Sequence, residues 1–224
     1  MFSVHLCVVK QLKKTKMKKS IAIVLGVLVT ASTVLAGTAK SEKTAFDIDT
    51  KASKVVWNAK KVTGEHTGNV SLNNGKVWVE KNAVVGANVN INMNSISCTD
   101  LTDAEWNKKL VGHLKSDDFF SVEKHPTASF EITSVKKGSN GDYTVNGKLS
   151  IKGITNEISF PAKVSVANGT VKANGTAKVD RTKYDIKYGS GKFFEGLGDK
   201  MIYDEFEITF DLTAKESGKE LSVK

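Results

Sequence analysis

Residues 143–180 read YTVNGKLSIKGITNEISFPAKVSVANGTVKANGTAKVD, and the pattern in this stretch decides the fold class. Apolar and small residues alternate with polar ones, which is the period of strands that bury one face. Short connectors at Lys152-Gly153 and Asn168-Gly169 interrupt the alternation, and such pairs tolerate the positive φ angles of tight hairpin turns. The stretch therefore predicts three consecutive antiparallel strands.

The same period recurs on both sides of this stretch. Residues 85–93, 130–133 and 205–212 alternate in the same way, and further strands are expected around Trp57 and around Val77. Asn73-Asn74-Gly75 and Ser139–Asp142 are expected to be turns. Roughly seven to nine strands with short links predict an all-β antiparallel domain, either an up-and-down barrel or a sandwich.

One segment, residues 102–114, has its apolar residues at helical spacing instead. Thr102 is expected to cap a short helix, with Glu105 at the third helical position completing a capping box.

The first 36 residues have the features of an export signal. Met17-Lys18-Lys19 is basic, Ser20–Leu35 is apolar or small, and Val34-Leu35-Ala36 suits signal peptidase. We expect residues 1–36 to be an upstream extension plus a signal peptide starting at Met17, and residues 37–224 to be one periplasmic or secreted domain. An N-terminal anchor helix is the alternative. No cysteine adjoins the cleavage site, so a lipoprotein anchor is not expected.

Charge and cysteine content narrow the function classes further. The chain carries a net charge of +9, but residues 1–36 contribute six lysines and no acid, which leaves 9 − 6 = +3 for the rest. That balance does not indicate nucleic-acid binding. Cys98 is the single cysteine after residue 36, so no internal disulfide is expected, and Cys98 is expected to be buried.

The apolar face is expected to point into a soluble barrel rather than out to lipid. Aromatic residues make up only 8% of the chain, and Glu131, Lys148 and Glu207 lie mid-strand on the polar face. Small residues recur on the inward parity, so a cavity for an apolar ligand is expected unless large aromatic residues fill it. The small residues are Ala87, Gly147, Ala162, Ala173, Gly175 and Ala177; the large ones are Trp57, Phe130, Phe160 and Phe210.

No catalytic residue, metal site or cofactor is expected. His66, His113 and His125 show no metal-ligand spacing. Gly189-Ser190-Gly191-Lys192 fails the phosphate-loop pattern, because Ile186 stands where a glycine is required and Phe193 follows the lysine. Phe193, Phe194 and Leu197 in this glycine-rich loop are instead expected to cap an opening of the barrel.

Four segments together resemble the YceI family: residues 113–130 (HLKSDDFFSVEKHPTASF), 145–155 (VNGKLSIKGIT), 179–185 (VDRTKYD) and 204–208 (DEFEI). The resemblance covers about Phe46 to Ala214. It implies an antiparallel eight-stranded, lipocalin-like barrel with one helix, which holds a polyisoprenoid chain such as a quinone or prenyl lipid. The loop from Tyr188 to Asp199 is longer than the family core requires. The ligand-binding residues implied are Trp57, Val89, Ile91, Phe130, Leu149, Phe160 and Phe210 as apolar lining, with His113, Phe119 and Phe120 at the mouth; Ala173 and Ala177 face the same interior.

Three functions follow as hypotheses. The first is a non-catalytic carrier or reservoir of an isoprenoid lipid. The second is an enzyme acting on a prenyl or fatty substrate, for which the inward-facing residues offer no acid, histidine or serine. The third is an envelope module that docks on a membrane or protein through the loop bearing Phe193, Phe194 and Leu197. Transient membrane contact and a homodimer are left open.

Overall fold

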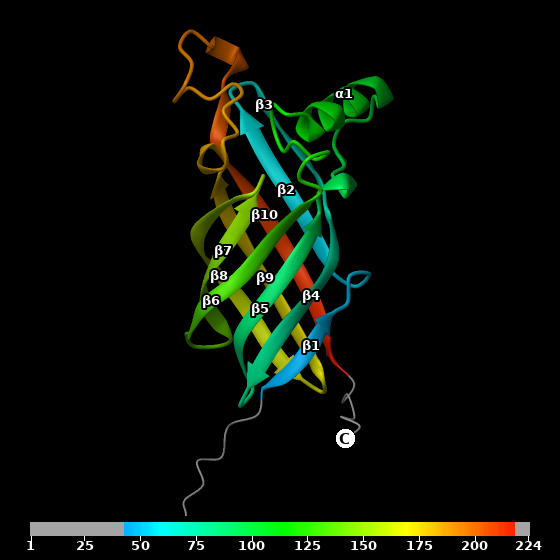
Figure 1. The fold of residues 1–224 in the computed structure, drawn as a ribbon, viewed down its shortest axis with the longest axis vertical. Coiled ribbons are helices and arrows are strands. Elements are labelled where there is room, and N and C mark those ends of the chain that lie inside the picture. The colour runs from blue at the N-terminus through cyan, green and yellow to red at the C-terminus, as the bar shows by residue number, and fades with distance from the viewer. Residues whose placement is uncertain (1–42, 218–224) are drawn as a thin grey trace, which may run out of the picture. The chain divides into compact units, whose positions relative to one another are not determined.

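The computed structural model describes residues 43–217, in which the alternating segments form ten β-strands (Figure 1). One α-helix, α1 (Ala104–Lys115), and three short 3-10 helices, η1 (Met93–Ser95), η2 (Arg181–Tyr184) and η3 (Gly198–Lys200), lie between them. The strands are β1 (Thr44–Ile48), β2 (Lys54–Lys61), β3 (Gly64–Asn69), β4 (Ser71–Glu80), β5 (Ala83–Asn92), β6 (Thr127–Lys137), β7 (Asp142–Ile151), β8 (Ile154–Ala167), β9 (Thr170–Asp180) and β10 (Ile202–Glu216).

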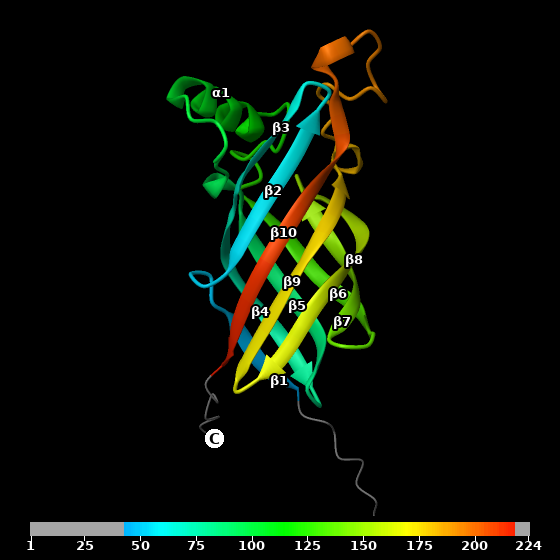
Figure 2. The same ribbon diagram turned by 180° about the vertical axis from the view of Figure 1, so that it is seen from behind.

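The sheet closes on itself, because β1 pairs with β4 on one side and with β10 on the other. β2 pairs with residues 202–211 of β10, and β1 pairs with residues 214–216 of the same strand. β1 and β2 therefore act as one interrupted strand, and β3 and β4, separated only by Val70, act as another. Figure 2 shows β2, β10 and β9 side by side on the wall that faces the viewer. The result is the predicted closed, eight-stranded antiparallel barrel with one α-helix, and the sandwich alternative is wrong.

Three of the predicted turns are confirmed. Lys152-Gly153 joins β7 to β8, Asn168-Gly169 joins β8 to β9, and Asn140-Gly141 lies in the link from β6 to β7. All six residues have positive φ. The backbone conformation that favours Asn and Gly is thus the one that these hairpins adopt.

The turn predicted at Asn73-Asn74-Gly75 is wrong, because these residues lie inside β4. The turn between β4 and β5 is instead Lys81-Asn82, with φ angles of 50° and 59°. Gly75 is required in β4 by close packing, since a Cβ there would lie 2.6 Å from Ile48 Cδ1 and 2.8 Å from the Asn88 carbonyl oxygen.

Register also differs from the prediction at the start of β5. Val85 is exposed, whereas Val84 and Ala87 are buried. A break in register between Trp78 and Val79 of β4 is the cause, because one irregularity in pairing moves a side chain to the opposite face.

The helix forms where predicted, but its cap is one residue later. Asp103, not Thr102, accepts hydrogen bonds from the backbone N–H groups of Glu105 and Trp106. Leu114 is the buried residue of α1, while Trp106 is exposed to solvent.

Gly147 in β7 is a sensitive point of the barrel wall. A Cβ at Gly147 would overlap the Phe130 ring and lie 2.5 Å from the Glu131 carbonyl oxygen. We expect Gly147→Ala to lower the free energy of unfolding, measured in urea, by about 1–3 kcal/mol, as overpacking does. Gly86→Ala is the matched control, because its Cβ would lie 3.5 Å from Trp78, an ordinary contact. Equal unfolding midpoints for the two variants would contradict the packing described here.

Candidate functional site

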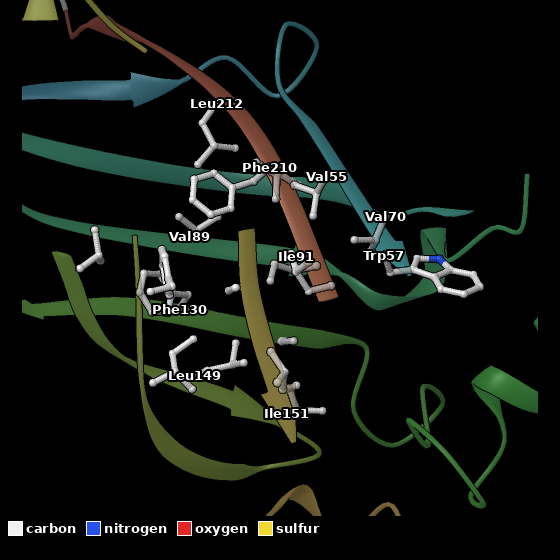
Figure 3. A pocket seen from close by; sticks show the side chains of 18 of the residues that line it. Val55, Trp57, Val70, Val89, Ile91, Phe130, Leu149, Ile151, Phe210 and Leu212 are labelled. Atoms are coloured by element: carbon white, nitrogen blue, oxygen red, sulfur yellow. The ribbon is translucent and has the colours of Figure 1, made fainter. Parts of the chain in front are cut away.

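The barrel encloses a cavity with a volume of about 240 Å³. Every strand except β3 contributes lining side chains, and Figure 3 shows those of Val89, Ile91, Phe130, Leu149 and Phe210 directed into the interior. The lining extends from Val171 and Ala214 near one end of the barrel to Ile186 and Ile202 near the other. From Val171 to Val179 this is roughly 26 Å along β9, at about 3.3 Å per residue. The cavity is therefore long and narrow.

The lining is almost wholly apolar. Arg181 is its one charged residue, and none of the lining residues in the described part of the chain is a carboxylate, histidine, serine or cysteine. An apolar cavity of about 150 Å³ already takes up benzene and stays dry. A larger cavity with this lining suits a slender hydrocarbon, and it offers none of the side chains most often used for acid–base or nucleophilic chemistry.

Aromatic rings fill part of the interior but do not close it. Phe130, Phe160 and Phe210 form a row, with ring centroids 5.4 and 5.6 Å apart. Phe210 packs over Gly175 in the same way that Phe130 packs over Gly147. The two glycines thus provide space for rings rather than for a ligand, whereas the alanines predicted to face inward line the remaining cavity.

The buried apolar residues form two clusters. One joins most of the barrel wall, and the smaller one contains Tyr143, Val145, Phe160, Ala162 and Ala177. Residues of both clusters line the cavity. Both packed regions therefore border the cavity.

Eleven of the twelve residues expected to bind ligand line the cavity. His113 does not: its Nε2 lies 3.1 Å from Asp118 Oδ2, and its ring packs edge-on against Phe119 and Tyr188. His113 therefore supports Phe119 from outside, and ligand contact by any of the twelve stays a prediction. The eleven are Trp57, Val89, Ile91, Phe119, Phe120, Phe130, Leu149, Phe160, Ala173, Ala177 and Phe210.

Arg181 is the main residue that sequence reasoning missed. It is only 4% exposed, and its guanidinium donates hydrogen bonds to the carbonyl oxygens of Ile186, Tyr188, Ile202 and Tyr203 at 2.8–3.0 Å. Burial lowers the pKa of Arg181, and the nearby Asp204 and Asp180 carboxylates oppose that shift. Arg181 thus fastens both ends of the loop between η2 and β10 at one end of the cavity. The only signal in the sequence was its place in a segment that resembles the family.

The prediction that Phe193, Phe194 and Leu197 cap an opening of the barrel is wrong. Phe193 and Phe194 are 43% and 50% exposed, and neither they nor Leu197 lines the cavity. Ile186, Ile202 and Tyr203 are the residues beside Arg181 that reach the cavity from this end. The glycine-rich loop therefore presents its phenylalanines to solvent.

Comparison with known proteins places the chain in a family. The chain belongs to the YceI-like domain family, which matches residues 46–214. A UPF0312 protein of Serratia proteamaculans is 34% identical over 135 residues, which are 60% of this chain and 59% of that protein. A UPF0312 protein of Pectobacterium atrosepticum is 42% identical over 77 residues, 34% of this chain. That match spans 36% of the relative's length.

Two solved structures share the fold. The crystal structure of Burkholderia cenocepacia BcnA has a TM-score of 0.59 and 24% identity, covering 75% of this chain and 99% of that one. A polyisoprenoid binding domain from Saccharophagus degradans, implicated in plant cell wall breakdown, has a TM-score of 0.58 and 15% identity, covering 78% and 99%. Within residues 43–217, no helix has the length and apolar character needed to cross a bilayer.

Proposed function

We propose that this protein binds a long isoprenoid lipid, a polyprenyl chain or an isoprenoid quinone, and carries or stores it without changing it chemically. The observation that carries this proposal is the long, narrow, apolar cavity with one charged lining residue. The polyisoprenoid binding domain of similar fold supports the choice of lipid. The lipid is the ligand, and no separate cofactor is required.

Simple energetics favour a long chain. Burying one methylene-sized group contributes about 0.8 kcal/mol, so a five-carbon isoprene unit contributes about 4 kcal/mol. Association costs on the order of 4–15 kcal/mol. Roughly one to four buried units offset that cost, and longer chains bind with a surplus. Binding through the tail alone is therefore sufficient, and a charged contact to the head group is not needed.

Export is part of the same proposal. The predicted signal peptide, residues 1–36, lies outside the described residues. Cleavage after Ala36 would leave the barrel free in the periplasm or outside the cell, where an insoluble lipid needs a carrier to cross water.

The cavity is tested by filling it. Ala177 in β9 is 5% exposed and lines the cavity, so Ala177→Trp places a large ring in the path of the lipid. We expect bound ubiquinone-10, measured by its absorbance after gel filtration, to fall at least about tenfold. Ala173→Trp is a second variant with the same expected result.

Lys172→Trp is the matched control, because Lys172 lies on the same strand and faces solvent. It is expected to bind ubiquinone-10 as the parent does, and circular dichroism checks that all variants fold. Unchanged uptake by both folded cavity variants would place the ligand elsewhere.

A second candidate function, docking on a membrane surface, is favoured by the distribution of exposed apolar residues. Within residues 43–217, seven of the eight large exposed hydrophobic residues lie at the end of the barrel that carries α1; Val85 is the exception. Contacts join the elements of this end: Val62 N–H bonds the Met201 carbonyl, His113 packs on Tyr188, and Asn156 bonds the Lys183 carbonyl. The seven, which we call the apolar rim, are Val62, Trp106, Ile154, Tyr188, Phe193, Phe194 and Tyr203.

Aromatic side chains of this kind settle at the interface of a lipid bilayer. Positioned at one end of a lipid cavity, the apolar rim would allow the barrel to collect its ligand directly from a membrane. The loop from Asp185 to Lys200 carries three acidic and three basic residues, so the attraction is expected to be apolar rather than electrostatic.

Docking is tested with phosphatidylcholine vesicles. Phe193→Ser with Phe194→Ser is expected to reduce co-sedimentation severalfold, because two exposed rings are lost, while binding of ubiquinone-10 from detergent persists. Val85→Ser is the control, because it removes an exposed apolar side chain that lies away from the rim. Equal co-sedimentation of the parent and both variants would remove the membrane role and leave the cavity proposal intact.

A further inference from the structure

Three potential metal ligands meet on the outside of the barrel, although no spacing motif in the sequence predicts them. His66 comes from β3, and Cys98 and Asp100 come from the segment between η1 and α1. One ligand atom from each lies within 4.8 Å of the other two. His66 Nδ1 is 2.7 Å from Asp100 Oδ2, and Cys98 Sγ is 3.2 Å from Asp100 Oδ1.

The backbone holds these residues in place from two directions. Residues 97–99 continue the barrel wall along β3, since Ser97 N–H bonds the Asn69 carbonyl and Thr99 N–H bonds the Thr67 carbonyl. On the other side, the Asn107 side chain of α1 donates to the carbonyl oxygens of Cys98 and Leu101. The positions of the three ligands are therefore set before any ion arrives, which is the condition for tight binding.

Asp100 joins the other two ligands through both of its carboxylate oxygens. Oδ2 lies 2.7 Å from His66 Nδ1, and Oδ1 accepts hydrogen bonds from Thr67 N–H at 2.9 Å and from Cys98 Sγ at 3.2 Å. The Asp100 carboxylate is thus the centre of the cluster.

The donor set and its exposure fit one class of ion. Imidazole nitrogen, thiolate sulfur and carboxylate oxygen together are the ligands that zinc takes, and three protein ligands leave a position for water. Cys98 is buried, while the side chains of His66 and Asp100 are 32% and 31% exposed, so the open position faces solvent. We infer that His66, Cys98 and Asp100 form a zinc site on the outer wall of the barrel.

Charge is balanced when the ion binds. The Cys98 thiol loses its proton to solvent, and the resulting thiolate and the Asp100 carboxylate together carry two negative charges that the ion neutralises. No oxidation or reduction is involved. This site revises the expectation, drawn from sequence spacing, that the chain has no metal ligands.

The site adjoins the cavity without being part of it. None of the three residues lines the cavity, but Ile96 does, and the Trp57 indole donates to the Ser97 carbonyl oxygen at 3.0 Å. A bound ion would therefore fix the segment that covers Trp57. Metal binding does not depend on lipid binding, so each can fail without the other.

The test is titration of the full chain with Co²⁺, which substitutes for zinc and absorbs through a thiolate charge-transfer band. We expect one equivalent to produce the band and added Zn²⁺ to abolish it. Cys98→Ser is expected to remove the band, and His66→Ala and Asp100→Asn to weaken binding by roughly tenfold or more, since even changes beyond the direct ligands cost that much. The amide oxygen introduced by Asp100→Asn can still accept the hydrogen bond from Thr67 N–H, so this variant retains the local fold.

His125→Ala is the matched control, because it removes the same ligand type elsewhere in the chain. It is expected to bind Co²⁺ like the parent. No thiolate band in the parent, or a band that survives in Cys98→Ser, would overturn the site whatever the variants do to folding.

Discussion

The structure depends on the closure of its sheet, in which β1 bonds β4 along one edge and β10 along the other. Closure leaves the barrel wall without a free edge and divides every strand into an inner and an outer face. Since water is excluded from the inner face, the residues there must be apolar or fully hydrogen-bonded. Arg181, the buried cation among the described residues, meets this condition by donating to four backbone carbonyl oxygens.

What the barrel can do follows from how its interior is filled. Phe130 and Phe210 pack over Gly147 and Gly175, and the ring of Phe160 lies between them, so these three rings fill only part of the interior. The space that remains is lined by small and branched apolar residues along the length of the barrel. Packing thus leaves an apolar cavity along the barrel. The described residues of its lining include no carboxylate or histidine.

Much of this was predictable from sequence, and the exceptions have physical causes. Period-two alternation in residues 143–180 predicted strands and turns, because each depends on local chemistry. It did not separate a barrel from a sandwich, since both bury one face; the resemblance to a family did. The Asn73-Asn74-Gly75 segment was predicted to be a turn, but close packing against Ile48 is what requires its glycine. Val85 was expected on the buried face, but a break in register turns it outward. Both close packing and register are properties of paired strands, not of local sequence. Neither the burial of Arg181 nor the meeting of His66 with Cys98 follows from local sequence, as each depends on contacts between distant segments.

The central claim is that the cavity holds an isoprenoid lipid in the cell. Mass spectrometry of an organic extract of the protein, purified from its native cells without added lipid, tests it most directly. We predict one prenyl lipid or isoprenoid quinone per protein chain in the extract. An extract free of such lipids, from a folded protein that also takes up no added ubiquinone-10, would contradict it.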